Sequence, residues 1–287
     1  MKKYIIYLQV FFVTICNFIL VIFLLPSKIF NSKKLNFSNY NLIIIGNGES
    51  INTNIKELVN HHKKYKILCV NYFLNSHLFP KLKPDLYCLT DKVFFKKTND
   101  KIIQKKKNNL KRELIKINYS MILLIPWNYR FSNFINFIQL NKNIKIKYIP
   151  NIPILDGIKP FSQFLINNNF ANPLYENVMI AAIYSSIRYK FKNIFLFGVE
   201  HDWIKSLIVN NNNELFCGKK FFYESENNKI LRDSFGNDIK LADIIYDFHH
   251  IIKSYHLLNK MALYNNIKII NCCENSMIDG FKKGTLN

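Results

Sequence analysis

The chain has 287 residues, of which 49% are hydrophobic and 15% aromatic, so it can bury a large core and does not have the composition of a disordered protein. Its formal net charge of +21, from 40 Lys and Arg against 19 Asp and Glu, indicates an anionic partner such as a phosphorylated substrate or an acidic surface. Only four of those cations are arginine, the side chain best suited to read base edges, so the composition argues against dedicated nucleic-acid recognition.

The N-terminal segment Tyr4–Leu25 contains 22 residues without a charge, and lysines flank it on both sides. About 20 apolar residues cross a bilayer as a helix. We therefore predict a single-pass membrane anchor over residues 1–29, with a buried N-terminal helix as the alternative. The lysines on both sides leave the orientation open. A polar linker is predicted over residues 30–40.

From residue 41 to residue 287, short apolar runs alternate with helical patterns. The predicted strands are Asn41–Ile45, Lys66–Val70, Leu86–Leu89, Met121–Ile125, Lys145–Ile149, Asn193–Gly198 and Ile267–Cys273. The predicted helices are 50–62, Glu176–Phe191 and Leu241–Tyr264. This alternation predicts an α/β domain with a Rossmann-like, largely parallel sheet and helices on both faces.

Two segments break this alternation. Lys92–Arg112 is very basic and favours a helix, whereas Lys205–Asp238 is polar and is typical of a hairpin. We predict a lid-like insertion near residues 205–240.

Six cysteines are spread along the chain: Cys16, Cys69, Cys88, Cys217, Cys272 and Cys273. No two of them form a CxxC pair, and adjacent cysteines suit neither a disulfide nor a zinc site. We expect reduced, mostly buried thiols in a domain that faces a reducing compartment.

The first predicted strand runs into "IGNGES", and ligands of open α/β sheets bind beyond the carboxyl ends of strands. Gly46 and Gly48 are expected to let the backbone approach a phosphate or sugar, at the start of a helix that supplies donors. A plain tight turn is the alternative, because the pattern matches neither GxGxxG nor a P-loop.

Two further polar groups stand at places where a ligand could bind. "FLFGVEHDW" ends a strand with Glu200, His201, Asp202 and Trp203, which favours a sugar- or base-binding lip over a metal cluster. The last predicted helix carries His249, His250 and His256, and a histidine near neutral pKa is a suitable general base for a hydroxyl. The sequence does not decide which of the three would act.

These groups occur in an order that resembles the bacterial sialyltransferases with a single Rossmann-like domain, and their uncharacterised surface-polysaccharide relatives. The family opens with Gly-Asn-Gly-Pro-Ser, where this chain has Gly46-Asn47-Gly48-Glu49-Ser50. "CVNYF" supplies Asn71, "LTDKVFF" supplies Asp91 where the family has Asn-Pro, and "IFLFG" precedes Glu200. Near the end, His249 precedes "IKIINCCENS" with Asn275 and Ser276.

The resemblance implies a metal-independent glycosyltransferase that transfers a nonulosonic-acid-type sugar from a CMP-activated donor, a co-substrate rather than a cofactor, to a glycan or lipid-linked glycan. It implies His249 as the catalytic base. The donor-binding residues that it implies are Gly46, Asn47, Gly48, Ser50, Asn71, Asp91, Glu200, Asn275 and Ser276. Such donors are made in the cytoplasm, so the expectation is a membrane-anchored protein with its catalytic domain there, acting in lipopolysaccharide or capsule biosynthesis; a homo-oligomer is left open.

Two alternatives stand beside this interpretation. A Mg²⁺-dependent pyrophosphokinase of the 6-hydroxymethylpterin type predicts that Asp91, Glu200 and Asp202 gather on the metal. A non-enzymatic, membrane-tethered scaffold predicts that the basic segment Lys92–Arg112 binds acidic lipid or polymer and releases it in salt.

Overall fold

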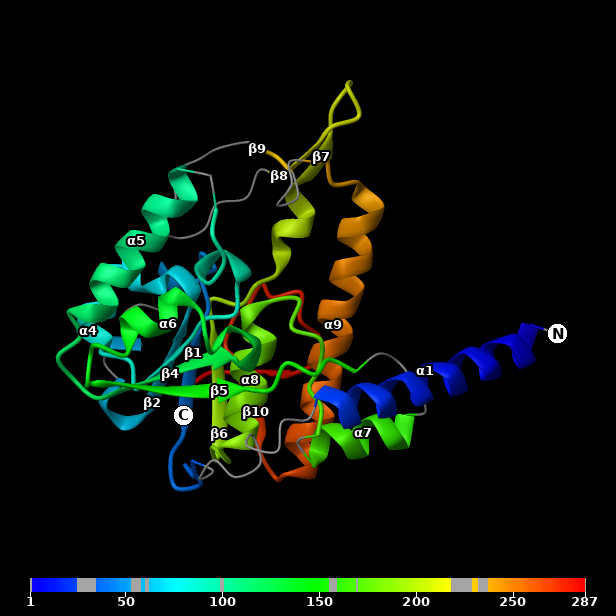
Figure 1. Ribbon diagram of the computed structural model, residues 1–287, viewed down its shortest axis with the longest axis horizontal. Helices are drawn as coiled ribbons and strands as arrows, with labels where there is room; N and C mark the ends of the chain where they lie inside the picture. Colours follow the sequence, from blue (N-terminus) through cyan, green and yellow to red (C-terminus); the bar gives the residue numbers. More distant parts are fainter. Residues whose placement is uncertain are drawn as a thin grey trace.

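The computed structural model describes residues 2–24, 35–52, 58–59, 62–98, 101–154, 159–168, 170–217, 229–231 and 237–286. Within these ranges an eight-stranded sheet forms the centre of the domain, and helices cover both of its faces (Figure 1). All neighbouring strands in this sheet are parallel. The predicted Rossmann-like α/β class is confirmed.

The strands follow the apolar runs of the sequence closely. In spatial order they are β11 (Lys282–Lys283), β10 (Lys268–Asn271), β6 (Asn193–Phe197), β1 (Leu42–Ile45), β2 (Lys66–Val70), β3 (Leu86–Cys88), β4 (Met121–Pro126) and β5 (Ile144–Ile149). The chain starts in the middle, runs outward to β5 and returns on the other side of β1. The order of connection therefore reverses between β1 and β6, which is where open α/β sheets place their ligands.

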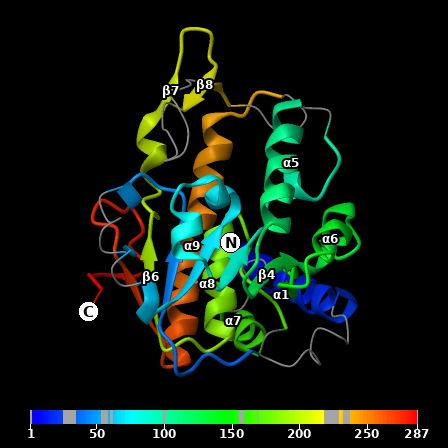
Figure 2. The same ribbon diagram turned by 90° about the vertical axis from the view of Figure 1, so that its left-hand side faces the viewer.

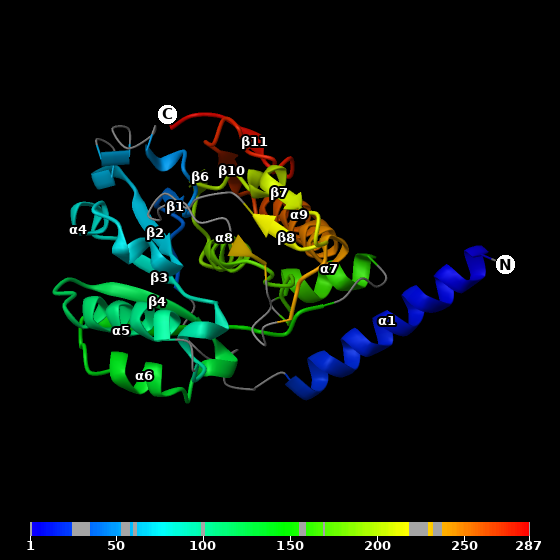
Figure 3. The ribbon, with the colours of Figure 1, turned by 90° about the horizontal axis from the view of Figure 1, so that it is seen from above.

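Alternate residues of each strand enter two separate cores. Leu42 and Ile44 pack on one face, against helices α7 (Lys159–Asn167), α8 (Val178–Arg188) and α9 (Leu241–Tyr264). Ile43 and Ile45 pack on the other face, against α4 (Phe79–Leu82), α5 (Lys101–Ile115) and α6 (Asn133–Ile138). Figure 3 shows the two helix groups on opposite sides of the sheet. Strands buried on both faces explain why the sequence shows continuous apolar runs instead of alternation.

The central helix α8 explains the small residues in its sequence. Residues 178–187 are all buried, and Ala181, Ala182, Ser185 and Ser186 leave room for the strands and for α9. The hydroxyls of Ser185 and Ser186 donate to the carbonyls of Ala181 (2.8 Å) and Ala182 (2.7 Å), so neither buried hydroxyl lacks a partner.

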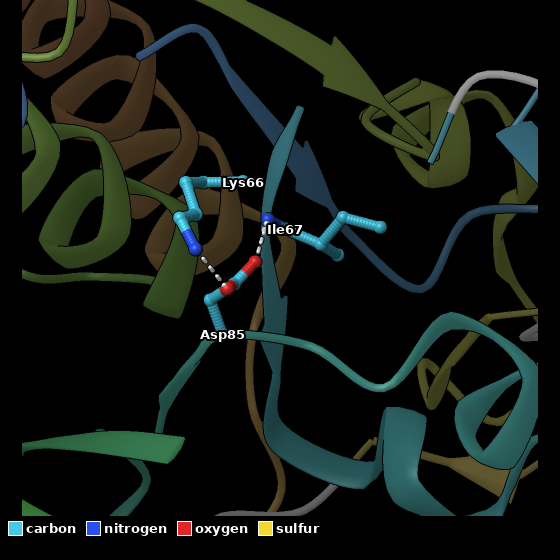
Figure 4. A network of polar contacts seen from close by, with 3 residues as sticks. All are labelled: Lys66, Ile67 and Asp85. Atoms are coloured by element: carbon cyan, nitrogen blue, oxygen red, sulfur yellow. Dashed lines mark hydrogen bonds and ion pairs between the residues drawn. The ribbon is translucent and has the colours of Figure 1, made fainter. Parts of the chain in front are cut away.

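An ion pair ties β2 to β3 at the amino end of the strands. The Asp85 carboxylate accepts from the Lys66 ammonium (2.6 Å) and from the backbone N–H of Ile67 (3.0 Å), as Figure 4 shows. Both side chains are about one third exposed (32% and 33%), so solvent weakens the ion pair. The contact fixes the start of β3 and lies at the opposite end of the strands from the candidate site.

The polar insertion contains a second, small sheet. β7 (Leu207–Val209) pairs antiparallel with β8 (Leu215–Cys217), and β8 pairs antiparallel with β9 (Lys229–Ile230). The β7–β8 hairpin projects beyond the carboxyl end of the large sheet, above the start of α9 (Figures 1 and 2). The expected hairpin is present, while residues 218–228 and 232–236 of the insertion lie outside the described residues.

The N-terminal segment forms a helix, α1 (Lys2–Leu24), that packs on α7. Phe18 lies 6.2 Å from Phe161 between ring centroids, and Asn17 and Val21 are buried. No helix in the described ranges combines the length and apolar character needed to cross a membrane, so the predicted single-pass anchor is not supported. The predicted linker also packs on the domain in its described part, since Phe37 stacks on Phe191 with ring centroids 4.7 Å apart.

Candidate functional site

The loops that follow β1 and β6 meet where the strand order reverses. The N–H of Gly46 donates to the carbonyl of Phe197 (2.8 Å), and the N–H of Gly48 donates to the carbonyl of Gly198 (2.9 Å). The two loops therefore continue side by side for two residues past the strands. They form the floor of the candidate site.

The two glycines of the β1 loop are required by the chain itself. A Cβ added to Gly46 would lie 2.3 Å from the Gly198 carbonyl oxygen, and one added to Gly48 would lie 1.4 Å from Oε2 of Glu200. Gly198 has a φ of +64°, a conformation that favours glycine. In both places an added Cβ would meet atoms of the chain itself, and the expected approach of a ligand to Gly46 and Gly48 stays a prediction. They clear space for the β6 loop and for a carboxylate of the same chain.

Glu200 occupies the position at which helix N-termini in other folds bind phosphate. Its side chain is buried, and its Oε1 accepts from the backbone N–H of Ser50 (2.8 Å) at the start of the helical residues 51–52. A carboxylate placed there satisfies an N–H that the helix leaves unpaired, and its charge repels a second anion. This position is therefore not available to a phosphate group.

The loop after β10 closes the same junction from the other side. The Cys273 thiol accepts from the N–H of Val199 (3.1 Å) and from the Ser50 hydroxyl (3.6 Å). Burial raises the pKa of Cys273 to about 11, so this thiol is neutral at physiological pH. The Ser276 hydroxyl is buried and donates to the Val199 carbonyl (2.8 Å), whereas Asn275 is exposed. Within the described residues the six cysteines form no disulfide, and Cys69, Cys88 and Cys273 are buried.

Two carboxamides on the other side of β1 have a different environment. The Oδ1 atoms of Asn47 and Asn71 are buried and have no hydrogen-bond partner among the described residues. Ile45 pairs with Cys69 in the β1–β2 register, so each asparagine stands two residues beyond paired positions on adjacent strands. Both asparagines therefore stand at the carboxyl ends of adjacent strands. Asn71 also has a φ of 46°, and backbone strain of this kind is concentrated at functional positions.

A hydrogen-bonded row joins the β6 loop to α9 and α8. Nε2 of His201 lies 2.7 Å from the Tyr255 hydroxyl, and the Asn177 side chain lies 3.2 Å from the same hydroxyl. His201 has a φ of 51°, and burial raises the pKa of Tyr255 well above its ordinary range. Asn177 also caps α8, because its Oδ1 accepts from the N–H of Ile180 (3.1 Å). The helix predicted from the sequence begins at Glu176, whereas α8 begins at Val178 with Asn177 as its cap.

The histidines of α9 lie beyond this row. α9 runs toward the amino end of the sheet (Figure 1), and Tyr255 contacts His201 just past the end of β6. Residues before Tyr255 therefore extend past the strand ends. His249 is exposed and six residues before Tyr255, about 9 Å further along the axis. His250 is partly buried, with its ring 5.5 Å from that of His249. His256 is exposed and lies 3.0 Å from an Asp279 oxygen.

Glu176 stands just before the start of α8, opposite the same part of α9. The pKa of its carboxyl is raised above the ordinary range, first by burial and then by the charge of Asp247, while His250 opposes the shift. Glu176, Asp247 and His250 are therefore neighbours, and two of them were not singled out from the sequence. A titratable patch thus extends from the β6 loop along α9.

The acidic residues proposed for a metal are not brought together. Asp91 follows β3 and accepts from the N–H of Val93 (3.1 Å), capping a short 3-10 helix. Glu200 follows β6, three strand spacings or about 14 Å across the sheet. Within the described residues no group of three His, Cys, Asp or Glu side chains could hold a metal ion. The cluster that the pyrophosphokinase alternative requires is absent from these residues.

Trp203, expected at a sugar- or base-binding lip, lies in a 3-10 helix after β6 (Asp202–Ser206). Its ring packs edge-on against Phe248 of α9, with centroids 5.8 Å apart. The pair connects the base of the β7–β8 hairpin to α9, on the same side as the His201–Tyr255 contact.

Comparison with known proteins gives one distant likeness to report. No family model matches the chain, and no curated protein matches it. Among six chains of solved structures that match, one is the MAf glycosyltransferase from Magnetospirillum magneticum AMB-1, at 13% identity and a TM-score of 0.48. The alignment covers 88% of this chain and 34% of that chain, so this chain spans about a third of its length. At this level the likeness carries no information on substrate or chemistry.

Proposed function

We propose that the protein is a glycosyltransferase that moves a nonulosonic-acid-type sugar from a CMP-activated donor to a surface glycan. The observation that carries the proposal is the pair of buried carboxamide oxygens of Asn47 and Asn71, which have no partner among the described residues and stand beside the strand-order reversal at the carboxyl end of the sheet. The order of motifs in the sequence supplies the donor class.

The unpartnered oxygens indicate the kind of group that a ligand offers. Each is a hydrogen-bond acceptor, so it suits a hydroxyl or an amino group and not a phosphate oxygen. A ribose, a sugar ring and a cytosine amine all provide such donors. The Glu200 carboxylate already lies at the start of the helix, so the donor's phosphate lies away from it. The floor beneath the donor is then formed by residues that do not contact its phosphate, namely Gly46, Gly48, Ser50, Glu200 and Ser276.

The reaction proposed needs one base and no redox chemistry. The bond between the anomeric carbon and the phosphate oxygen of the donor breaks, and CMP leaves with the bonding electrons. The acceptor hydroxyl oxygen forms the new bond to that carbon, and its proton passes to an imidazole of α9, for which we propose His249. His249 is exposed at the overhanging part of α9, which suits a group that meets an acceptor from solution. Asp91 and Asn275, at the ends of β3 and β10, remain proposed donor contacts.

The first experiment follows nucleotide release by the full chain from a panel of CMP-sialic acid, other CMP-nonulosonates, UDP-sugars and ATP, with and without EDTA. We expect CMP release that survives EDTA and is lost in His249→Ala. His256→Ala is the matched control, because His256 faces Asp279 and should leave turnover unchanged. His250→Ala tests whether the neighbouring imidazole is the base instead.

Two results would overturn the proposal. EDTA-sensitive turnover of ATP would favour the pyrophosphokinase class. Release of CMP that is unaffected in Asn47→Ala and in both His249→Ala and His250→Ala would place the chemistry outside this site.

A further inference from the structure

Helix α5 lies on the face of the sheet opposite α8 and α9 (Figures 2 and 3). A basic hollow of about 620 Å³ lies along this helix. Four cationic side chains line it: Lys101, Lys105, Lys111 and Arg112. Three carboxamide side chains lie among them, and Phe137 of α6 forms an apolar part of the wall. No residue discussed for sugar transfer belongs to this hollow.

The charge of α5 exceeds what the composition of the chain explains. Lysine makes up about an eighth of the whole sequence but more than a third of residues 101–116. This segment has seven cations and one carboxylate, Glu113, which pairs with Lys116 (2.6 Å) outside the hollow. Lys106 and Lys107 point elsewhere, toward the Tyr72 ring and the Lys96 carbonyl. The four cations that line the hollow are therefore a local concentration of charge without a carboxylate among the lining residues.

This arrangement costs helix stability. Lys101 and Lys105 are one turn apart at the N-terminal end of α5, where like charges repel and the helix dipole disfavours cations. Lys107 and Lys111 repeat the spacing, and the pKa of Lys107 is lowered by burial and by Lys111. An anion in the hollow would relieve this repulsion.

We propose that the hollow binds a linear acidic saccharide, whose carboxylate or phosphate groups contact the cations and whose hydroxyls contact the carboxamides. Lys101, Lys105 and Arg112 follow one another along the helix over about 16 Å, a span that matches several sugar units better than one small anion. Carboxamides among cations suit a ligand with both charges and hydroxyls. A single arginine with a single aromatic ring is a poor base-stacking platform.

The test measures binding of fluorescently labelled polysialic acid to the full chain by polarisation at low salt. We expect Lys101→Gln, Lys105→Gln and Arg112→Gln together to weaken binding by about tenfold, as loss of three exposed charge contacts implies. The control, Lys192→Gln, Lys260→Gln and Lys268→Gln, removes equal charge from exposed positions outside the hollow and should change affinity less than about twofold.

Three results would overturn the proposal: equal weakening in both triple variants, equal binding of neutral dextran, or tighter binding of single-stranded DNA or anionic vesicles with the same dependence on the three cations. Nucleotide release from the panel above is measured on the same triple variant. Because the hollow lies on the opposite face of the sheet, its loss leaves donor turnover intact, so failure of one proposal does not imply failure of the other.

Discussion

The two junctions on either side of β1 differ in how their polar groups are satisfied. Between β1 and β6, the Glu200 carboxylate, the Ser50 N–H and the Cys273 thiol all bond to each other or to neighbouring backbone. Between β1 and β2, the carboxamide oxygens of Asn47 and Asn71 are buried without a partner among the described residues. On one side of β1 the polar groups of the loops are paired within the chain. On the other side two buried carboxamide oxygens have no partner among the described residues.

The difference separates stability from binding. A buried polar group that the fold satisfies contributes to stability, whereas one left unsatisfied costs free energy until a ligand pairs with it. We therefore expect substitutions at the β1–β6 junction to lower the free energy of unfolding, and those at the β1–β2 junction to lower ligand affinity with little loss of stability.

The largest expected effect is that of Gly46→Ala. The added Cβ would lie 2.3 Å from the Gly198 carbonyl oxygen, a backbone atom that cannot move without displacing β6. We expect a loss of about 3 kcal/mol or more in the free energy of urea unfolding. Gly284→Ala is the control, because its Cβ would meet a side-chain methyl of Ile270 at 3.0 Å and should cost about 1 kcal/mol. Similar losses in both variants would contradict the role assigned to the glycine.

The second prediction is a coupling between Gly48 and Glu200. Gly48→Ala places a Cβ 1.4 Å from the Glu200 carboxylate and should cost about 2–3 kcal/mol by displacing it from the Ser50 N–H. Glu200→Ala removes that hydrogen bond and should cost about 2 kcal/mol. The double variant should be no less stable than the worse single variant, because the clash is gone. Additive losses in a double-mutant cycle would show that the carboxylate does not fill this space.

The third prediction concerns alkaline pH. The pKa of Cys273 is about 11 in the folded protein against an ordinary value of 9.0, so the folded state favours the neutral thiol. Its contribution is complete below pH 9 and is lost as the pH rises toward 11, by about 2 kcal/mol. Cys273→Ala should flatten this part of the decline in unfolding free energy. An unchanged slope would contradict the assignment.

The sequence predicted the fold well and the site only in part, for a physical reason. Apolar runs and helix periodicity are local, so Lys66–Val70 and Leu241–Tyr264 appear in the structure with the predicted bounds. The contact of Glu200 with Ser50 spans 150 residues, and that of Tyr255 with His201 depends on how α9 packs against the end of β6. Such contacts leave no local pattern. The atoms that an added Cβ at Gly46 or Gly48 would meet belong to the distant β6 loop, so no local pattern around the glycines names them.

The smallest expected change in stability is that of Asn47→Ala. Its Oδ1 atom is buried without a partner, so removing the carboxamide should leave the free energy of unfolding unchanged or raise it by up to about 1 kcal/mol. The same substitution should weaken binding of the proposed CMP-sugar by about tenfold, since a hydrogen bond within a buried site is worth about 1–2 kcal/mol. Calorimetric titration of CMP into the variant and into Asn143→Ala, whose exposed side chain lies at the amino end of β5, measures this directly. If Asn47→Ala lowered the free energy of unfolding and left the affinity for CMP unchanged, the two junctions would not differ in the way described. Stability kept and affinity lost would place the ligand over β1 and β2, on the side of β1 where the chain leaves its own hydrogen bonds unmade.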